Sequence, residues 1–164
     1  MIEGRVWRFG DDVDTDAIVP GKYLILSMPE IAAHAMEGVM PDFAELVRPG
    51  DVIVAGRNFG NGSSREVAAR AILLLGVRAV IAESFARIFF RNCVNVGLAP
   101  IECPEAGLIE KGQRVRIDLV AGRVDIVETG KRLEAVPLPA EINAIVESGG
   151  LEGFLRHRAG RGTT

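Results

Sequence analysis

The sequence has few of the residues that build metal centres, since only two of its 164 residues are cysteine and two are histidine. Cys93 and Cys103 lack the C-x-x-C spacing of a zinc motif, and an iron–sulfur site or a disulfide scaffold needs more thiols. His34 and His157 have no serine or cysteine nucleophile signature beside them, so a hydrolytic triad is poorly supported. We therefore expect no metal to be held by this chain alone.

An excess of positive charge is also missing, because 19 lysines and arginines face 22 acidic residues and give a formal net charge of -3. Such a chain offers no net positive field to nucleic acid or to an anionic membrane. Its longest apolar stretch, residues 71–77, is far shorter than the roughly 18 residues of a membrane span, and its first residues lack a basic-then-apolar signal. We expect a cytoplasmic protein that binds neither nucleic acid nor membrane.

What the sequence does contain is an ordinary globular balance, with 48% hydrophobic and 25% charged residues. The length corresponds to about one domain. We expect a single domain over residues 1–164, with residues 155–164 forming a frayed tail.

Short apolar runs alternate with helical patterns through the first two thirds of the chain. This alternation predicts an α/β fold with right-handed crossovers and a partly parallel sheet. The expected strands are residues 5–9, 51–55, 79–82 and 99–102. The expected helices are residues 27–37, starting with the capping-box spacing of Ser27 and Glu30, then residues 63–75 and 84–96.

The last third of the chain has a different pattern. Val115, Ile117 and Leu119 alternate with polar residues, and a turn at Ala121 and Gly122 precedes a second alternating run, which predicts an antiparallel hairpin. Two short helices are expected over residues 139–148 and 151–157. The fold class is therefore α/β, with a mixed, partly parallel sheet flanked by helices.

The segment Gly60-Asn61-Gly62-Ser63-Ser64-Arg65 lies between a strand and a helix, where dinucleotide-binding proteins carry G-x-G-x-x-G. Arg65 replaces the third glycine, which argues against a dinucleotide. The same residues could instead receive a carboxylate or phosphate through backbone N–H groups, two hydroxyls and a guanidinium. Alternatively, Ser63 or Ser64 only caps the helix, with Glu66 completing a capping box. The residues alone leave these interpretations open.

An acidic segment, Asp12-Val13-Asp14-Thr15-Asp16, imitates the start of a calcium-binding loop. The glycine needed at the sixth position is Ala17, and the glutamate needed at the twelfth is Tyr23, so calcium binding is not predicted. The segment is either a solvated loop or an active-site loop that directs a carboxylate toward a pocket.

Three segments in order along the chain resemble a known family: GDDVDTDAI at residues 10–18, GRNFGNGSSRE at 56–66 and AESFARIFFRN at 82–92. Together they look like the small subunit of 3-isopropylmalate dehydratase, which corresponds to the swivelling domain of aconitase. The resemblance implies a β/β/α swivelling domain. It also implies a hydro-lyase that interconverts 2-isopropylmalate and 3-isopropylmalate by loss and re-addition of water, in leucine biosynthesis.

The resemblance further implies how the site is shared between two chains. A four-iron four-sulfur cluster is expected on three cysteines of a separate large subunit, and this chain, with no cluster of its own, is expected to be active only with that partner. Ser63 matches the general base, Ser64 and Arg65 match residues that bind a carboxylate of the small dicarboxylate substrate, and Thr15 with Asp16 match residues that complete the pocket.

Substrate choice is expected to depend on the loop Tyr23, Leu24, Ile25 and Leu26. Relatives that act on homoaconitate carry an arginine after the Tyr-Leu pair, whereas here apolar residues follow, which favours an apolar substrate branch. One residue departs from the family, because Val67 stands where a histidine is usual. A related dehydratase for homoaconitate or another alkylmalate, and a stand-alone nucleotide-binding or anion-binding module, remain as alternatives.

Overall fold

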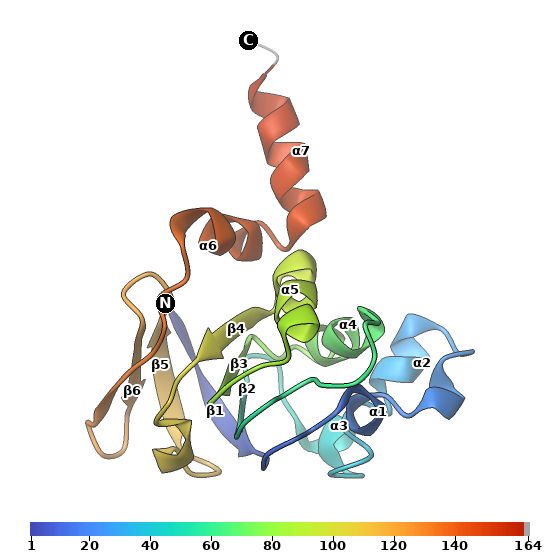
Figure 1. Cartoon of the computed structure of the whole chain (residues 1–164), viewed down its shortest axis with the longest axis horizontal. Coiled ribbons are helices and arrows are strands. Elements are labelled where there is room, and N and C mark those ends of the chain that lie inside the picture. The colour runs from blue at the N-terminus through green and yellow to red at the C-terminus, as the bar shows by residue number, and fades with distance from the viewer. Residues whose placement is uncertain (163–164) are drawn as a thin grey trace.

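Seven strands of the described chain form one mixed sheet (Figure 1). The structure is a computed structural model and describes residues 1–162. The strand order across the sheet is β4-β3-β2-β1-β5-β6-β7. In chain order the strands are β1 (Ile2–Arg8), β2 (Val52–Ala55), β3 (Ala79–Ala82), β4 (Ala99–Glu102), β5 (Arg114–Asp118), β6 (Arg123–Ile126) and β7 (Arg132–Glu134).

Strands β1 to β4 pair in parallel, as the alternation of strands and helices predicts. Helix α4 (Val67–Leu74) connects β2 to β3, and helix α5 (Arg87–Val96) connects β3 to β4. The other half of the sheet is antiparallel, and β5 with β6 is the expected hairpin. Strand β7 was not expected, because its three residues are too few to show an alternating pattern.

The parallel strands are buried on both faces because each face belongs to a different core. In β2, Ile53 and Ala55 pack in the core under the helices. Val52 and Val54 point the other way and join a second core. That second core also contains inward side chains of the antiparallel strands, namely Val115, Ile117, Val124, Ile126 and Leu133. The sheet is therefore curled, with antiparallel strands, parallel strands and helices in successive layers, which confirms the expected fold class.

The connection from β1 to β2 contains four short elements: α1 (Thr15–Ile18), the 3₁₀ turn η1 (Gly21–Tyr23), α2 (Met28–Ala32) and α3 (Phe43–Leu46). Helix α2 begins as predicted, with the Ser27 N–H donating to Glu30 Oε2 at 3.0 Å. It ends at Ala32, however, and not at residue 37. The reason lies outside the helix, because the Met36 N–H donates to the Ile18 carbonyl at 2.8 Å and the Gly38 N–H to the Ala17 carbonyl at 3.0 Å.

Two other helices begin later than their sequence patterns indicate. Helix α4 begins at Val67 with Glu66 at its N-cap position, so neither Ser63 nor Ser64 caps it. Helix α5 begins at Arg87 and not near Ser84, because the Ser84 carbonyl accepts the N–H of Phe59 at 3.1 Å. Ile88, expected on the apolar face of this helix, is 49% exposed.

The chain ends in helices α6 (Ala140–Glu147) and α7 (Leu151–Arg161), and η2 (Ala106–Leu108) follows β4. Residues 155–161 belong to α7, so the expected frayed tail over 155–164 is wrong for this part, and residues 163 and 164 lie outside the described chain. Helix α7 extends away from the sheet (Figure 1). None of the helices formed by residues 1–162 has the length and apolar character needed to cross a membrane.

Candidate active site

The three family-like segments meet at one edge of the sheet, because they follow the carboxyl ends of the neighbouring parallel strands β1, β2 and β3. Ligand sites of α/β sheets commonly lie at this edge. The Gly60 N–H donates to the Val13 carbonyl at 2.7 Å, and the Thr15 N–H donates to the Asn61 carbonyl at 2.8 Å. The first segment is therefore bonded directly to the second.

The glycines of the second segment are required by close packing. Gly60 has a φ of +83°, and a Cβ there would lie 2.1 Å from Cγ of the Phe89 ring on α5. Gly62 has a φ of +106°, and a Cβ there would lie 3.1 Å from Thr15 Oγ1. Both positions have left-handed conformations that glycine adopts readily. The segment 56–66 can therefore pack closely against both the Phe89 ring and the Thr15 side chain.

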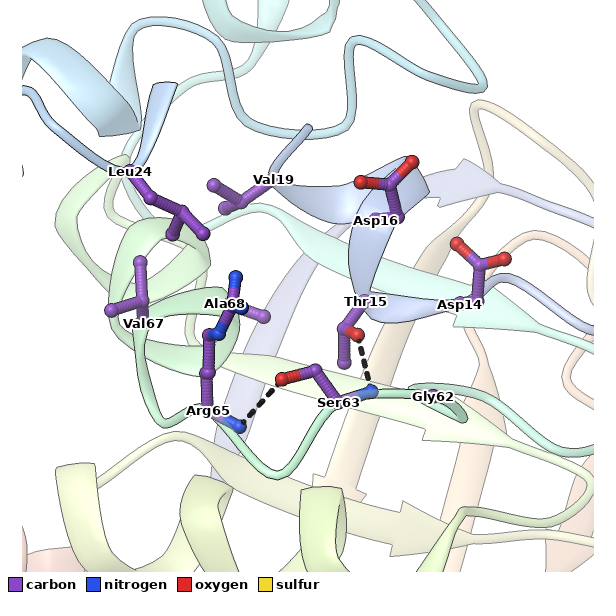
Figure 2. Close-up of a pocket in the computed structure, with 10 residues that line it drawn as sticks. All are labelled: Asp14, Thr15, Asp16, Val19, Leu24, Gly62, Ser63, Arg65, Val67 and Ala68. Carbon is purple, nitrogen blue, oxygen red and sulfur yellow. Dashed lines mark hydrogen bonds between the residues drawn. The ribbon is translucent and has the colours of Figure 1, made fainter. Parts of the chain in front are cut away.

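Two hydrogen bonds hold Ser63 in place, one from its backbone N–H and one to its side-chain hydroxyl (Figure 2). Its N–H donates to Thr15 Oγ1 at 2.9 Å, and its Oγ accepts the Arg65 N–H at 3.2 Å. The next residue is fixed as well, because Asn92 on α5 donates from Nδ2 to the Ser64 carbonyl at 3.0 Å. The sequence does not predict this role of Asn92, because a single asparagine in a helix does not indicate which group its side chain will bind.

A pocket of about 260 Å³ opens beside Ser63 (Figure 2). One part of its lining is polar and the other is apolar. The polar part consists of Asp14, Thr15, Asp16, Ser63 and Arg65, next to Gly62, and the apolar part consists of Val19, Leu24, Val67 and Ala68. We call these last four residues the apolar wall. In Figure 2, Leu24, Val19 and Val67 lie on the opposite side of the pocket from Asp14.

The charged side chains of the pocket differ in what they already bind. Asp14 Oδ1 accepts the Ala17 N–H at 2.7 Å as the cap of α1, and Asp16 Oδ1 accepts the Gly21 N–H at 3.0 Å. Within residues 1–162 the Arg65 guanidinium has no ion pair. The cation is thus free for an external anion, whereas both carboxylates hold the local backbone.

Most of the predicted site residues line this pocket, but the predicted specificity loop is only partly there. Leu24 lines the pocket, and Tyr23 and Leu26 do not. Ile25 is 91% exposed and points into no part of it. Ser64 is exposed and does not line the pocket, and its carbonyl accepts the hydrogen bond from Asn92.

The sequence predicts only Leu24 of the four residues in the apolar wall. Its members come from three separate segments of the chain, and ordinary valines and alanines show no chemical signature. Only the departure of Val67 from the family pattern indicated that this position differs from that of relatives, and Val67 does line the pocket.

The two cysteines do not fit a metal cluster. Cys93 lies in the core under the helices and Cys103 in the second core, on opposite faces of the sheet. Burial raises the pKa of both thiols, so both disfavour the thiolate that a metal needs. No group of three or more potential His, Cys, Asp or Glu ligands occurs within the part of the chain that the structure describes.

Comparison with known proteins agrees with this geometry. A family model described as the aconitase C-terminal domain matches residues 34–106. The chain is 49% identical over 156 residues to the 3-isopropylmalate dehydratase small subunit of Methanosarcina acetivorans, covering 94% of this chain and 96% of that relative. It is 50% identical over 158 residues to the small subunit of Aquifex aeolicus, covering 94% of each chain.

A solved structure points the same way. The crystal structure of 3-isopropylmalate dehydratase from Methanocaldococcus jannaschii matches with a TM-score of 0.91 and 47% identity, covering 96% of this chain and 95% of that one. These findings confirm the resemblance seen in the three segments. The chain belongs to the family of 3-isopropylmalate dehydratase small subunits, which are hydro-lyase subunits related to aconitase.

Proposed function

We propose that this chain, together with a large subunit, interconverts 2-isopropylmalate and 3-isopropylmalate by dehydration and rehydration. The observation that carries the proposal is the mixed lining of the pocket: it combines the Ser63 hydroxyl and Arg65, which has no ion pair within residues 1–162, with the apolar wall. A branched dicarboxylate has the same two parts, a charged end and an apolar branch.

Arg65 is proposed to bind a substrate carboxylate, because a guanidinium donates two parallel hydrogen bonds to the two carboxylate oxygens. The hydroxyl of the exposed Ser64, the residue between Ser63 and Arg65, is proposed to assist in binding that carboxylate. Thr15 and Asp16 are proposed to complete the pocket. Thr15 keeps the Ser63 backbone in place, and Asp16 holds the start of the 21–26 loop.

Ser63 is proposed to accept the proton that leaves the substrate carbon. A serine alkoxide is unfavourable in water, so the site must stabilise negative charge on Oγ. The donor already in place is the Arg65 N–H, 3.2 Å from Oγ, with the guanidinium charge of the same residue in the pocket. Helix α4 begins only at Val67, so this stabilisation comes from the loop and not from the first turn of the helix.

The apolar wall is proposed to receive the isopropyl branch. Burying a branch of this size contributes on the order of 1 to 3 kcal/mol. Val67 extends the apolar wall at the position where the family usually has histidine. A third carboxylate, as in homoaconitate, would face this apolar surface without a cation of its own among the described lining residues.

The four-iron four-sulfur cluster of the family is placed on the large subunit in this proposal. The cysteines of this chain do not fit it, and the roles given to Ser63 and Arg65 require no metal ligand from this chain.

The test is the substrate preference of the enzyme assembled from this chain and its large subunit. We expect kcat/KM for 2-isopropylmalate to exceed that for homoaconitate by at least about tenfold, the ratio that corresponds to 1.4 kcal/mol. Leu24→Ala should reduce this preference. Leu155→Ala, which truncates an exposed leucine on α7, is the matched control and should leave it unchanged.

Two results would contradict the proposal. Equal activity on homoaconitate would show that the apolar wall does not select the branch. Tight binding of ATP or NADH by this chain alone, without dehydratase activity in the assembly, would favour the alternative of a nucleotide-binding module.

A further inference from the structure

Three polar side chains form a compact cluster beside the pocket, outside its lining. The rings of Tyr23 and His34 are stacked, with centroids 3.8 Å apart and planes within 6°. The Tyr23 hydroxyl donates to Glu37 Oε1 at 2.7 Å, and His34 Nδ1 donates to Glu37 Oε2 at 2.6 Å. A carboxylate can only accept, so the His34 tautomer carries its proton on Nδ1. Each member thus contacts both of the others.

This cluster is built by hydrogen bonds and stacking more than by burial. The His34 and Glu37 side chains keep 38% and 30% of their surface exposed. Both oxygens of Glu37 are used, and these hydrogen bonds lower the pKa of Glu37 and raise the pKa of Tyr23. The ionised Glu37 and the neutral Tyr23 hydroxyl are therefore the forms that the cluster favours.

Tyr23 links the cluster to the pocket, because Tyr23 ends η1 and the next residue is Leu24 of the apolar wall. The backbone hydrogen bonds of this loop are local: the Tyr23 N–H donates to the Pro20 carbonyl at 3.0 Å and the Leu24 N–H to the Gly21 carbonyl at 3.2 Å. Asp16 holds the beginning of the loop through the Gly21 N–H. Tyr23 supplies a second attachment two residues further along, through its hydrogen bond to Glu37.

The far side of the cluster is firmly anchored to the rest of the site. Met36 is fully buried, has a φ of +65°, and donates its N–H to the Ile18 carbonyl at 2.8 Å. Gly38 packs so closely on α1 that a Cβ would lie 2.6 Å from the Ala17 Cα. Glu37 lies between these two fixed residues. The cluster therefore connects the loop that carries Leu24 to the helix that carries Thr15.

We propose that Tyr23, His34 and Glu37 are positioning residues that hold Leu24 in the apolar wall and so set how tightly the substrate branch is bound. The inference rests on the proposed function. It assigns these three residues no contact with the reacting atoms, which Ser63 and Arg65 face. Loss of the cluster should loosen the loop and weaken branch recognition, while proton transfer at Ser63 continues.

The test compares variants in the assembled two-subunit enzyme. Tyr23→Phe keeps the ring stack and removes the hydrogen bond to Glu37, and Glu37→Gln removes the charge with little change of shape. We expect each to raise KM for 2-isopropylmalate about three- to tenfold, the range of one hydrogen bond, with kcat within about twofold. The preference for 2-isopropylmalate over a methyl-branched malate should fall by a similar factor. The double variant should raise KM by less than the product of the two single increases, because both substitutions act on the same hydrogen bond.

Asp125→Asn is the matched control, because it removes a carboxylate of an exposed ion pair, 2.9 Å from Arg132, on β6. It should change neither KM nor the preference. A second readout does not depend on activity: amide hydrogen exchange in the full chain should become faster at residues 23–26 in Tyr23→Phe and stay unchanged on β6.

The outcomes separate the inference from the proposed function. A wild-type assembly inactive on 2-isopropylmalate would overturn the proposed function and the inference with it, whatever the exchange rates. An active wild type with unchanged KM and preference in Tyr23→Phe would overturn the inference alone. So would a fall in kcat as large as the rise in KM, or an equal effect of Asp125→Asn.

Discussion

Ser63 and the adjoining Ser64 are held by residues of three segments, the loop itself, α1 and α5, and each makes one hydrogen bond. Thr15, 7% exposed, accepts the Ser63 N–H, and the Arg65 N–H reaches Ser63 Oγ. Asn92 holds the following carbonyl from a different helix. In the role proposed for Ser63, a residue held in this way would need little rearrangement as charge develops on its hydroxyl, and such preorganisation lowers a barrier.

Replacing Ser63 with alanine tests its proposed role directly. We expect kcat to fall by roughly 10² to 10⁴-fold, the typical contribution of a general base, with little change in folding or in association with the large subunit. The backbone bond from Ser63 to Thr15 does not involve the lost hydroxyl and should persist. The measurement is kcat with 2-isopropylmalate, accompanied by circular dichroism of the variant.

Ser148→Ala is the matched control, since Ser148 Oγ donates to the Ala144 carbonyl on α6, away from the pocket. It should keep normal turnover. Near-normal turnover of Ser63→Ala would instead show that Ser63 only shapes the loop.

At the residue scale, the sequence predicts most of the polar lining of the pocket but only Leu24 of the apolar wall. Ser63 and Arg65 stand in a recognisable segment with chemistry of its own, and both line the pocket. Val19 and Val67 are 48 positions apart, and nothing in either residue type indicates that they share a wall. Ile25 was expected to face the substrate because of its place in the loop, but a loop's position does not fix where each side chain points.

At the scale of elements, local patterns predict most of the longer helices and strands, and hydrogen bonds to distant residues decide where several of the helices begin or end. The periodicity predicts the buried face of α4, and that of α5 except at Ile88, and both helices end near the expected glycines. Helix α2 is short because the N–H groups of Met36 and Gly38 donate to carbonyls of α1. The local sequence pattern does not contain this interaction, because α1 lies well before α2 in the chain. The start of α5 is displaced in the same way, since Phe59 takes the carbonyl of Ser84.

Close packing between the glycine loop and α5 leads to a stability prediction. Gly60→Ala should lower the free energy of unfolding by about 2 to 5 kcal/mol, because it combines left-handed strain with a clash against Phe89. Gly112→Ala is the matched control: Gly112 has a similar φ of +87°, but a Cβ there would meet nothing within 4 Å. It should show only the backbone cost, about 1 to 2 kcal/mol.

Urea unfolding of both variants provides the measurement. The difference between the two losses isolates the contact with Phe89. Equal losses in the two variants would mean that α5 yields to the added methyl group and that the loop does not depend on this packing.

At the scale of the whole molecule, the curled sheet separates the two cysteines. Each is buried in its own core, and the parallel strands lie between the two cores. A cluster with cysteine ligands needs at least three thiolates that converge on one point. This separation agrees with the proposal that the cluster is held by the large subunit, while this chain contributes Ser63 and Arg65.

This separation predicts how the cluster depends on the cysteines of this chain. A double variant, Cys93→Ala with Cys103→Ala, should assemble with the large subunit into an enzyme with the same iron content and the same visible absorbance as the wild type. Each substitution removes one buried sulfur and costs roughly 1 kcal/mol or somewhat more of folding stability, so expression at low temperature should preserve the fold. Treatment of the isolated wild-type chain with iron and sulfide under anaerobic conditions should leave it colourless and inactive. A stable brown cluster in the isolated chain, or loss of iron from the assembled double variant, would show that this subunit supplies a ligand after all.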